Sequence, residues 1–179
     1  MLNHSWLVVV DFGEPLSDAD ARKYRSMIGM LFFDANCLRQ GIRFTGGLLS
    51  RFLSKAHRIY FSCSKRILLY FSGSQLGFYY GSAPSVNIFG YTYCDWAVAV
   101  GDRKSIGGYT FTINGTPVTW SSKKQTSVAV PKYEAEYVAL TEVVEKSMFL
   151  NVLFKYIASE VNTPCIHCDN SSAINLAKK

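Results

Sequence analysis

The chain has 179 residues, of which 49% are hydrophobic and 15% aromatic, and it carries a formal net charge of +6. This length fits one ordinary domain, or a small domain with an appendage, and the apolar content argues against a disordered polymer. The sequence contains no run of about 18 consecutive apolar residues, so a membrane-spanning helix is not expected.

Basic residues are concentrated in the first half of the chain. The segment from Ala21 to Arg66 holds ten basic residues and a single acid, Asp34, so the remainder of the chain is net acidic. This asymmetry is typical of proteins that bind a polyanion, with a nucleic-acid backbone as the first candidate. The alternative is a helical surface whose charges only keep the protein in solution.

The five cysteines are an odd number and do not suggest a disulfide framework. Since no secretory signal is recognisable, we expect a reducing, intracellular location, either cytoplasmic or nuclear. The stretch Cys165-Ile-His-Cys168 has zinc-type residues, but a zinc site normally takes four ligands and no second pair completes this one. If the stretch is a strand, its two cysteines face opposite sides, so zinc is not expected there.

The first half of the chain is predicted to be helical. Ser17 and Asp20 have the spacing of a capping box, and a helical pattern continues from Gly47 to Gly73, where the glycine suits a helix end. Apolar residues recur at helical intervals after the cap, at Tyr24, Ile28, Leu31 and Phe32.

The second half, after Gly81, has the alternation of strands. Residues 86–93, 107–115 and 116–122 are predicted as three antiparallel strands, and Asn114-Gly115 favours a hairpin turn between the last two. A helix is expected from Pro131 to Ile157, followed by a short strand and a final helix capped by Asn170 or Ser171. The fold class is therefore α/β with a mixed sheet.

Three carboxylates arrive from different predicted elements. Asp95 follows the first strand, Glu136 lies in the first turns of the long helix, and Asp169 sits where the last strand meets the last helix. Magnesium prefers oxygen ligands, and two such ions about 4 Å apart can clamp the attacking and leaving oxygens of a phosphodiester. Taken singly, each acid also fits a structural role, as a turn residue, a helix-surface residue or a helix cap.

Several blocks of the sequence carry a resemblance to a known family. Residues 101–130, 134–150 and 168–179 resemble the ribonuclease H domain of copia-type LTR retrotransposon polyproteins. The earlier blocks DARKYRSMIGML, GLLSRF and SKRILLYFSGSQLGFYY resemble the end of the reverse transcriptase in the same polyproteins. We therefore predict a helical reverse-transcriptase remnant in residues 1–80 and a ribonuclease H-like domain, incomplete at its C-terminus, in residues 86–179.

The resemblance implies a magnesium-dependent nuclease that cuts the RNA strand of an RNA–DNA hybrid with four acids. Glu136 corresponds to the second acid and Asp169 to the third, whereas the family's fourth lies in a segment beyond Lys179. The first acid falls on Tyr93, and Asp95 matches the acid two residues later, which normally has a supporting role. A neutral phenol is a poor magnesium ligand, and two strand residues displace Asp95 by roughly 6 to 7 Å.

This copy is therefore expected to have little or no nuclease activity. The alternatives are a remnant that binds nucleic acid without cutting it and a pseudogene product with no role. Candidate nucleic-acid contacts combine basic side chains with one hydroxyl, and they are Arg51, Arg58, Lys65, Arg66, Ser121, Lys123 and Lys124.

Overall fold

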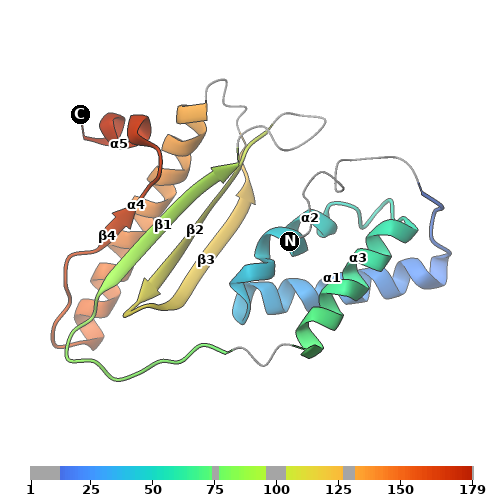
Figure 1. The fold of residues 1–179 in the computed structure, drawn as a ribbon, viewed down its shortest axis with the longest axis horizontal. Helices are drawn as coiled ribbons and strands as arrows, with labels where there is room; N and C mark the ends of the chain where they lie inside the picture. The colour runs from blue at the N-terminus through green and yellow to red at the C-terminus, as the bar shows by residue number, and fades with distance from the viewer. Residues whose placement is uncertain (1–12, 74–76, 96–103, 127–131, 179) are drawn as a thin grey trace. The chain divides into compact units, whose positions relative to one another are not determined.

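The computed structural model describes residues 13–73, 77–95, 104–126 and 132–178, with side chains from residue 134 onward in the last range (Figure 1). The chain divides into two compact units, Met1–Gly77 and Phe78–Lys179. This division lies close to the predicted boundary between residues 80 and 86. The identities assigned to the two parts from sequence remain predictions, and each unit is described by itself.

The first unit is helical, as predicted. It contains α1 (Asp18–Cys37), the 3₁₀ turn η2 (Gln40–Ile42), α2 (Arg43–Ser50) and α3 (Arg58–Gly73). The Ser17 side chain caps α1 by accepting a hydrogen bond from the Asp20 backbone N–H at 3.2 Å, which confirms the predicted start. Gly73 ends α3, as its position in the sequence indicated.

One predicted helical stretch is interrupted. Residues 51–57 leave the helical path between α2 and α3, although the sequence pattern runs through them. Here the backbone forms hydrogen bonds with residues 14–16 instead. The Leu16 N–H donates to the Ala56 carbonyl at 3.0 Å, and the Arg58 N–H, at the start of α3, donates to the Glu14 carbonyl at 3.1 Å. The ring of Phe52 also stacks on Tyr60 at 4.1 Å between centroids. Long-range contacts therefore override the local helical preference.

The core of the first unit is built on one face of α1. Tyr24, Ile28 and Leu31 are buried, as the helical spacing predicted, and they pack with Leu49 of α2 and Ile67 of α3. The Tyr24 hydroxyl donates a hydrogen bond to the Leu49 carbonyl at 2.8 Å, so this buried polar group is satisfied.

The second unit contains a four-stranded mixed sheet in the order β3-β2-β1-β4. The strands are β1 (Ile88–Asp95), β2 (Ile106–Ile113), β3 (Thr116–Lys124) and β4 (Cys165–His167). β1–β2 and β2–β3 are antiparallel, whereas β1–β4 is parallel. The predicted combination of three antiparallel strands with one parallel strand is confirmed.

The β2–β3 hairpin turns at the predicted pair of residues. Asn114 and Gly115 have positive φ angles of 49° and 87°, which is the conformation that Asn-Gly favours in a tight turn. β3 continues to Lys124, two residues past its predicted end, so Lys123 and Lys124 belong to a strand.

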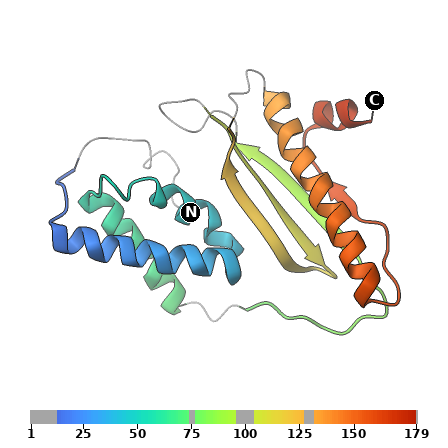
Figure 2. The ribbon, with the colours of Figure 1, turned by 180° about the vertical axis from the view of Figure 1, so that it is seen from behind.

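Two helices complete the second unit, α4 (Lys132–Ile157) and α5 (Ser171–Ala177). Figures 1 and 2 show α4 lying along one face of the sheet. Val143 and Leu150 of α4 pack on Ile88 and Phe111 of the sheet, which forms the core of this unit. Pro131, predicted in the first helical turn, lies outside the described residues. The Asn170 side chain caps α5 by accepting from the Ala173 N–H at 3.0 Å, which decides between the two predicted caps.

The two faces of β1 differ in exposure. Ile88, Gly90, Thr92 and Cys94 are buried, while the alternate residues are exposed or partly so. Cys94 packs with Ala135 and Ala139 of α4, so the buried residues face that helix. None of the helices within the described ranges has the length and apolar character needed to cross a membrane.

Candidate metal-binding site

Two of the predicted acids come together in the second unit. Ligand atoms of Glu136 and Asp169, together with Cys168, all lie within 4.8 Å of one another. Glu136 is only 2% exposed, Cys168 is partly buried and Asp169 is exposed. The structure therefore brings the carboxylates of Glu136 and Asp169 close together. The Cys168 thiol lies beside them, although it was not among the predicted ligands.

The local fold explains how these side chains meet. Glu136 adjoins Ala135, which packs against Cys94 of β1, so the first turns of α4 hold the glutamate close to the sheet. Cys168 and Asp169 fill the short link between β4, which ends at His167, and the Asn170 cap of α5. A strand end and a helix cap thus fix both sides of this link.

Asp95 does not join the group. The last β1–β4 pair is Tyr91 with His167, so Tyr93 and Asp169 each follow that pair by two residues, Tyr93 within β1 and Asp169 in the link after β4. Only a continuation of the same register beyond His167 would place an acid at position 93 beside Asp169. Asp95 lies another two residues on, opposite Ile106, which is roughly 6 to 7 Å further along the strand.

Tyr93 itself is directed toward the other neighbouring strand. It is paired with Gly108 of β2, and its ring fills the space that a Cβ atom on that glycine would occupy. Since β2 and β4 flank β1 on opposite sides, the ring covers the β2 side rather than the side of Asp169. Position 93 therefore supplies no metal-binding oxygen next to Asp169.

The environment of Cys168 opposes ionisation of its thiol. Burial raises the pKa of the Cys168 thiol above its usual value; the hydrogen bond with the Asn170 backbone lowers it in part, and the charges of Glu136 and Asp169 add to the increase. Without a bound cation, the thiol is therefore neutral at physiological pH.

The paired-cysteine interpretation of residues 165–168 needs one correction. β4 ends at His167, so Cys168 is not a strand residue facing away from Cys165, as the sequence suggested. The Cys165 thiol is exposed and lies 3.8 Å from His167 Nε2, whereas Cys168 joins the two acids. None of the five cysteines forms a disulfide in the described structure.

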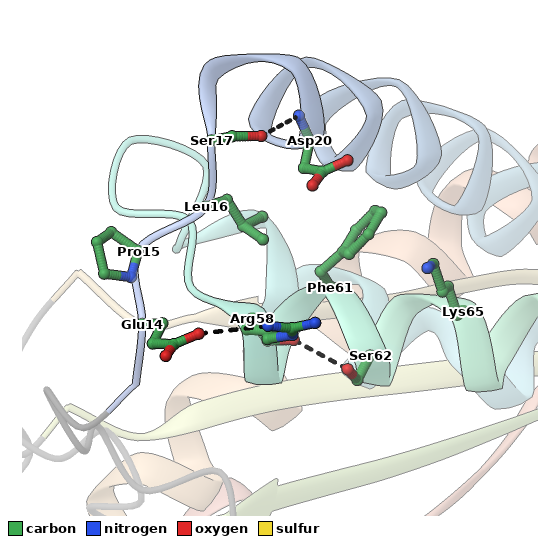
Figure 3. A pocket seen from close by; sticks show the side chains of 9 residues that line it. All are labelled: Glu14, Pro15, Leu16, Ser17, Asp20, Arg58, Phe61, Ser62 and Lys65. Carbon is green, nitrogen blue, oxygen red and sulfur yellow. Dashed lines mark hydrogen bonds and ion pairs between the residues drawn. The ribbon is translucent and has the colours of Figure 1, made fainter.

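The predicted nucleic-acid contacts in the first unit differ in their surroundings. Arg51, Arg58, Lys65 and Arg66 are all exposed. Arg58 forms an ion pair with Glu14 at 3.3 Å, as Figure 3 shows, and the Lys65 ammonium lies 4.2 Å from the centre of the Phe61 ring. For Arg51 and Arg66, no ion pair with another described residue is observed.

A pocket of about 400 Å³ separates α1 from the start of α3 (Figure 3). The pocket is lined by charged residues of both signs: the acids Glu14 and Asp20 and the bases Arg58 and Lys65. The two acids make the pocket unsuited to a phosphate. The remaining lining residues are Pro15, Leu16, Ser17, Phe61 and Ser62.

The predicted contacts in the second unit also divide by exposure. Lys123 and Lys124 are exposed at the end of β3, whereas Ser121 is only 8% exposed. The Ser121 hydroxyl therefore has little access to a phosphate, and the two lysines are the accessible part of this segment.

The fold and the cluster define a class of protein: a mixed α/β domain that brings two acids and a thiol together beside one edge of its sheet.

No family model matches the chain. Over 157 residues, or 87% of its length, the chain is 34% identical to the retrovirus-related Pol polyprotein from transposon TNT 1-94 of Nicotiana tabacum, of which it spans 12%. It is also 38% identical to the putative transposon Ty5-1 protein YCL074W of Saccharomyces cerevisiae, over 70% of the chain and 41% of that protein.

A third relative is similar in length to this chain. The secreted RxLR effector protein 161 of Plasmopara viticola is 35% identical over 130 residues, which cover 72% of the chain and 92% of that protein. The chain belongs to the family that these proteins share, that of retrotransposon Pol polyproteins and their relatives.

Proposed function

We propose that the second unit is a ribonuclease H-like domain that keeps two metal-binding carboxylates, Glu136 and Asp169, but does not cleave RNA–DNA hybrids. One observation carries this proposal. Position 93 and Asp169 each follow the last β1–β4 pair by two residues, and position 93 holds a tyrosine whose ring covers Gly108. The centre therefore lacks an acid at the place where the family resemblance expects its first one.

The sheet and the placement of the acids support the ribonuclease H-like assignment. Three antiparallel strands, a fourth parallel strand and a helix across one face are compatible with that fold. Glu136 lies in α4 and Asp169 in the link between β4 and α5, at the positions that match the second and third acids of the resemblance.

The donors present do not fit the pair of magnesium ions that the resemblance implies. Magnesium takes oxygen ligands in near-octahedral geometry, and two ions need bridging and terminal oxygens from several acids. The cluster offers two carboxylates, and its third donor is the Cys168 thiol, which is a poor ligand for so hard an ion. Loss of the acid at position 93 is therefore expected to lower catalysis by orders of magnitude.

We further propose that the first unit is the reverse-transcriptase end of the same polyprotein and that it contributes nucleic-acid binding. The observation in favour is the set of exposed basic side chains at Arg51, Lys65 and Arg66. A chain with both properties would hold a hybrid duplex through its phosphates and leave its RNA strand intact.

The test is a hybrid-cleavage assay with the whole chain in Mg²⁺, alongside Glu136→Gln. We expect cleavage by the unmodified chain to be no greater than that by the variant, while both retain salt-sensitive binding to the same hybrid. Cleavage that Glu136→Gln abolishes would show that the centre works and that the proposal is wrong.

A further inference from the structure

We propose that Glu136, Cys168 and Asp169 form a mixed thiolate–carboxylate site that binds a zinc-class transition-metal ion in preference to magnesium. The proposal concerns the donor set as it stands in this chain. It does not depend on whether the second unit is a nuclease, since it rests on the geometry and chemistry of the three side chains.

The spacing of the donors suits one small ion. A zinc–sulfur bond of about 2.3 Å and a zinc–oxygen bond of about 2.1 Å, at tetrahedral angles, place donors roughly 3.6 Å apart. The three donor atoms already lie within 4.8 Å of one another. Movements of about one ångström, within the reach of side-chain torsions, would close the site.

The chemistry of the donors selects the ion. A thiolate favours zinc and related ions over magnesium, which prefers an all-oxygen shell. Two carboxylates and one thiolate leave a fourth tetrahedral position for water, which is an arrangement that zinc accepts. The ion would also relieve the repulsion between the buried Glu136 and its neighbour Asp169.

A separate observation points to the same place. Thr92 is 7% exposed, and its Oγ1 atom is buried without a hydrogen-bond partner in the described structure. Thr92 faces α4, the helix that carries Glu136, and it directly follows Tyr91, whose β4 partner His167 directly precedes Cys168. A water on a metal bound between Cys168 and Glu136 would be a suitable partner for this hydroxyl.

The chain offers a matched control for the thiol. Cys165 lies three residues before Cys168, is exposed, and does not belong to the cluster. Replacing Cys165 removes a thiol from the same segment without removing a proposed ligand.

The experiment is a titration of the whole chain with Co²⁺, a spectroscopic substitute for zinc, in the presence of excess Mg²⁺. We expect a thiolate-to-cobalt charge-transfer band in the unmodified chain and in Cys165→Ser. We expect Cys168→Ser to abolish the band and to weaken Co²⁺ binding at least tenfold, with Glu136→Gln weakening it similarly. No band in the unmodified chain, or an undiminished band in Cys168→Ser, would overturn the proposal.

A measurement without substitutions guards against a variant that fails to fold. In the unmodified chain, Zn²⁺ should slow alkylation of Cys168 at least tenfold and leave that of Cys165 unchanged, as read by mass spectrometry of peptides. Equal rates at Cys168 with and without Zn²⁺ would contradict the site. Neither readout involves hydrolysis, so these results are distinct from the outcome of the cleavage assay.

Discussion

The ring of Tyr93 on β1 lies across Gly108 on β2, in the space where a side chain on residue 108 would begin. On the opposite face of the same strand pair, the ring of Phe111 covers Gly90 in the same manner. An aromatic ring over a cross-strand glycine shields backbone that the glycine leaves bare. Tyr93 thus has a packing role in the sheet at the position where the family resemblance predicts a metal-binding acid.

The two covered glycines should respond differently to a methyl group. Phe111 is fully buried, so a Cβ atom on residue 90 would be built 2.7 Å from a ring that has no room to move. Overpacking of this kind costs about 1–3 kcal/mol, and we expect Gly90→Ala to lower the unfolding free energy by that amount. Tyr93 is 38% exposed and can swing outward, so Gly108→Ala should cost less than about 1 kcal/mol. Urea denaturation measures both.

A double substitution checks the assignment of the Gly108 contact. If the ring of Tyr93 is the obstacle, Gly108→Ala should cost less in a Tyr93→Ala background than in the unmodified chain. An equal cost in both backgrounds would show that the strain comes from elsewhere.

Thr92→Val should stabilise the metal-free protein. Among the residues that the structure describes, the buried Thr92 hydroxyl has no hydrogen-bond partner, and valine keeps the shape of the side chain while removing that polar group. A buried, unsatisfied group costs about 1–3 kcal/mol, so thermal unfolding of the variant should occur at a higher temperature. A lower melting temperature would mean that the hydroxyl is hydrogen-bonded in solution.

Alkaline pH should destabilise the first unit through Tyr24. Burial raises the pKa of the Tyr24 hydroxyl well above its usual value, with Tyr60 and Cys63 adding to the effect. Below a pH of about 10, the group is protonated in both states and contributes no pH dependence. Above that pH, the unfolded state loses the proton first, so the unfolding free energy falls as the pH rises.

Tyr24→Phe is the matched control for this pH dependence. The variant loses the hydrogen bond to Leu49 and should be about 1 kcal/mol less stable at pH 8. Its stability should nevertheless decline less between pH 8 and pH 10.5, as followed by denaturation with helical circular dichroism. Parallel declines in the two proteins would exclude Tyr24 as the titrating group.

Nucleic-acid binding should depend more on Arg51 and Arg66 than on Arg58. Glutamine at either of the first two positions should weaken binding to an RNA–DNA hybrid and reduce the slope of log affinity against log salt by about 0.9. Arg58 is held by Glu14, so Arg58→Gln should change the slope less. Identical slopes in all three variants would indicate that none of these arginines contacts phosphate.

The positions of the acids could be predicted from the sequence, since each follows a boundary between elements. The helical pattern predicted from Pro131 put Glu136 in the first turns of the long helix, and the capping residues after the last strand put Asp169 just before the α5 cap. Cys168 was not among the predicted ligands, because a strand through Cys165 and Cys168 would point the two cysteines to opposite faces. Only the pairing with β1 shows that β4 ends at His167, and that pairing is a long-range feature.

The break between α2 and α3 had no local signal either. Residues 51–57 contain neither glycine nor proline, and their apolar spacing suits a helix. Their path depends on backbone bonds to residues 14–16, about forty positions earlier in the chain, and on the stacking of Phe52 with Tyr60. Such contacts form only in the folded unit, so sequence periodicity does not reveal them.

The most direct test of this account is Mn²⁺ binding by Tyr93→Asp and Tyr93→Asn, measured by calorimetry on the whole chain. Both substitutions remove the ring from Gly108, but only the first adds a carboxylate, so their comparison isolates the acid. If position 93 lies beside Asp169, as a continuation of the β1–β4 register past His167 would place it, Tyr93→Asp should bind Mn²⁺ at least tenfold more tightly than Tyr93→Asn. Equal affinities in two folded variants would contradict the claim that Tyr93 occupies the place of a lost metal ligand.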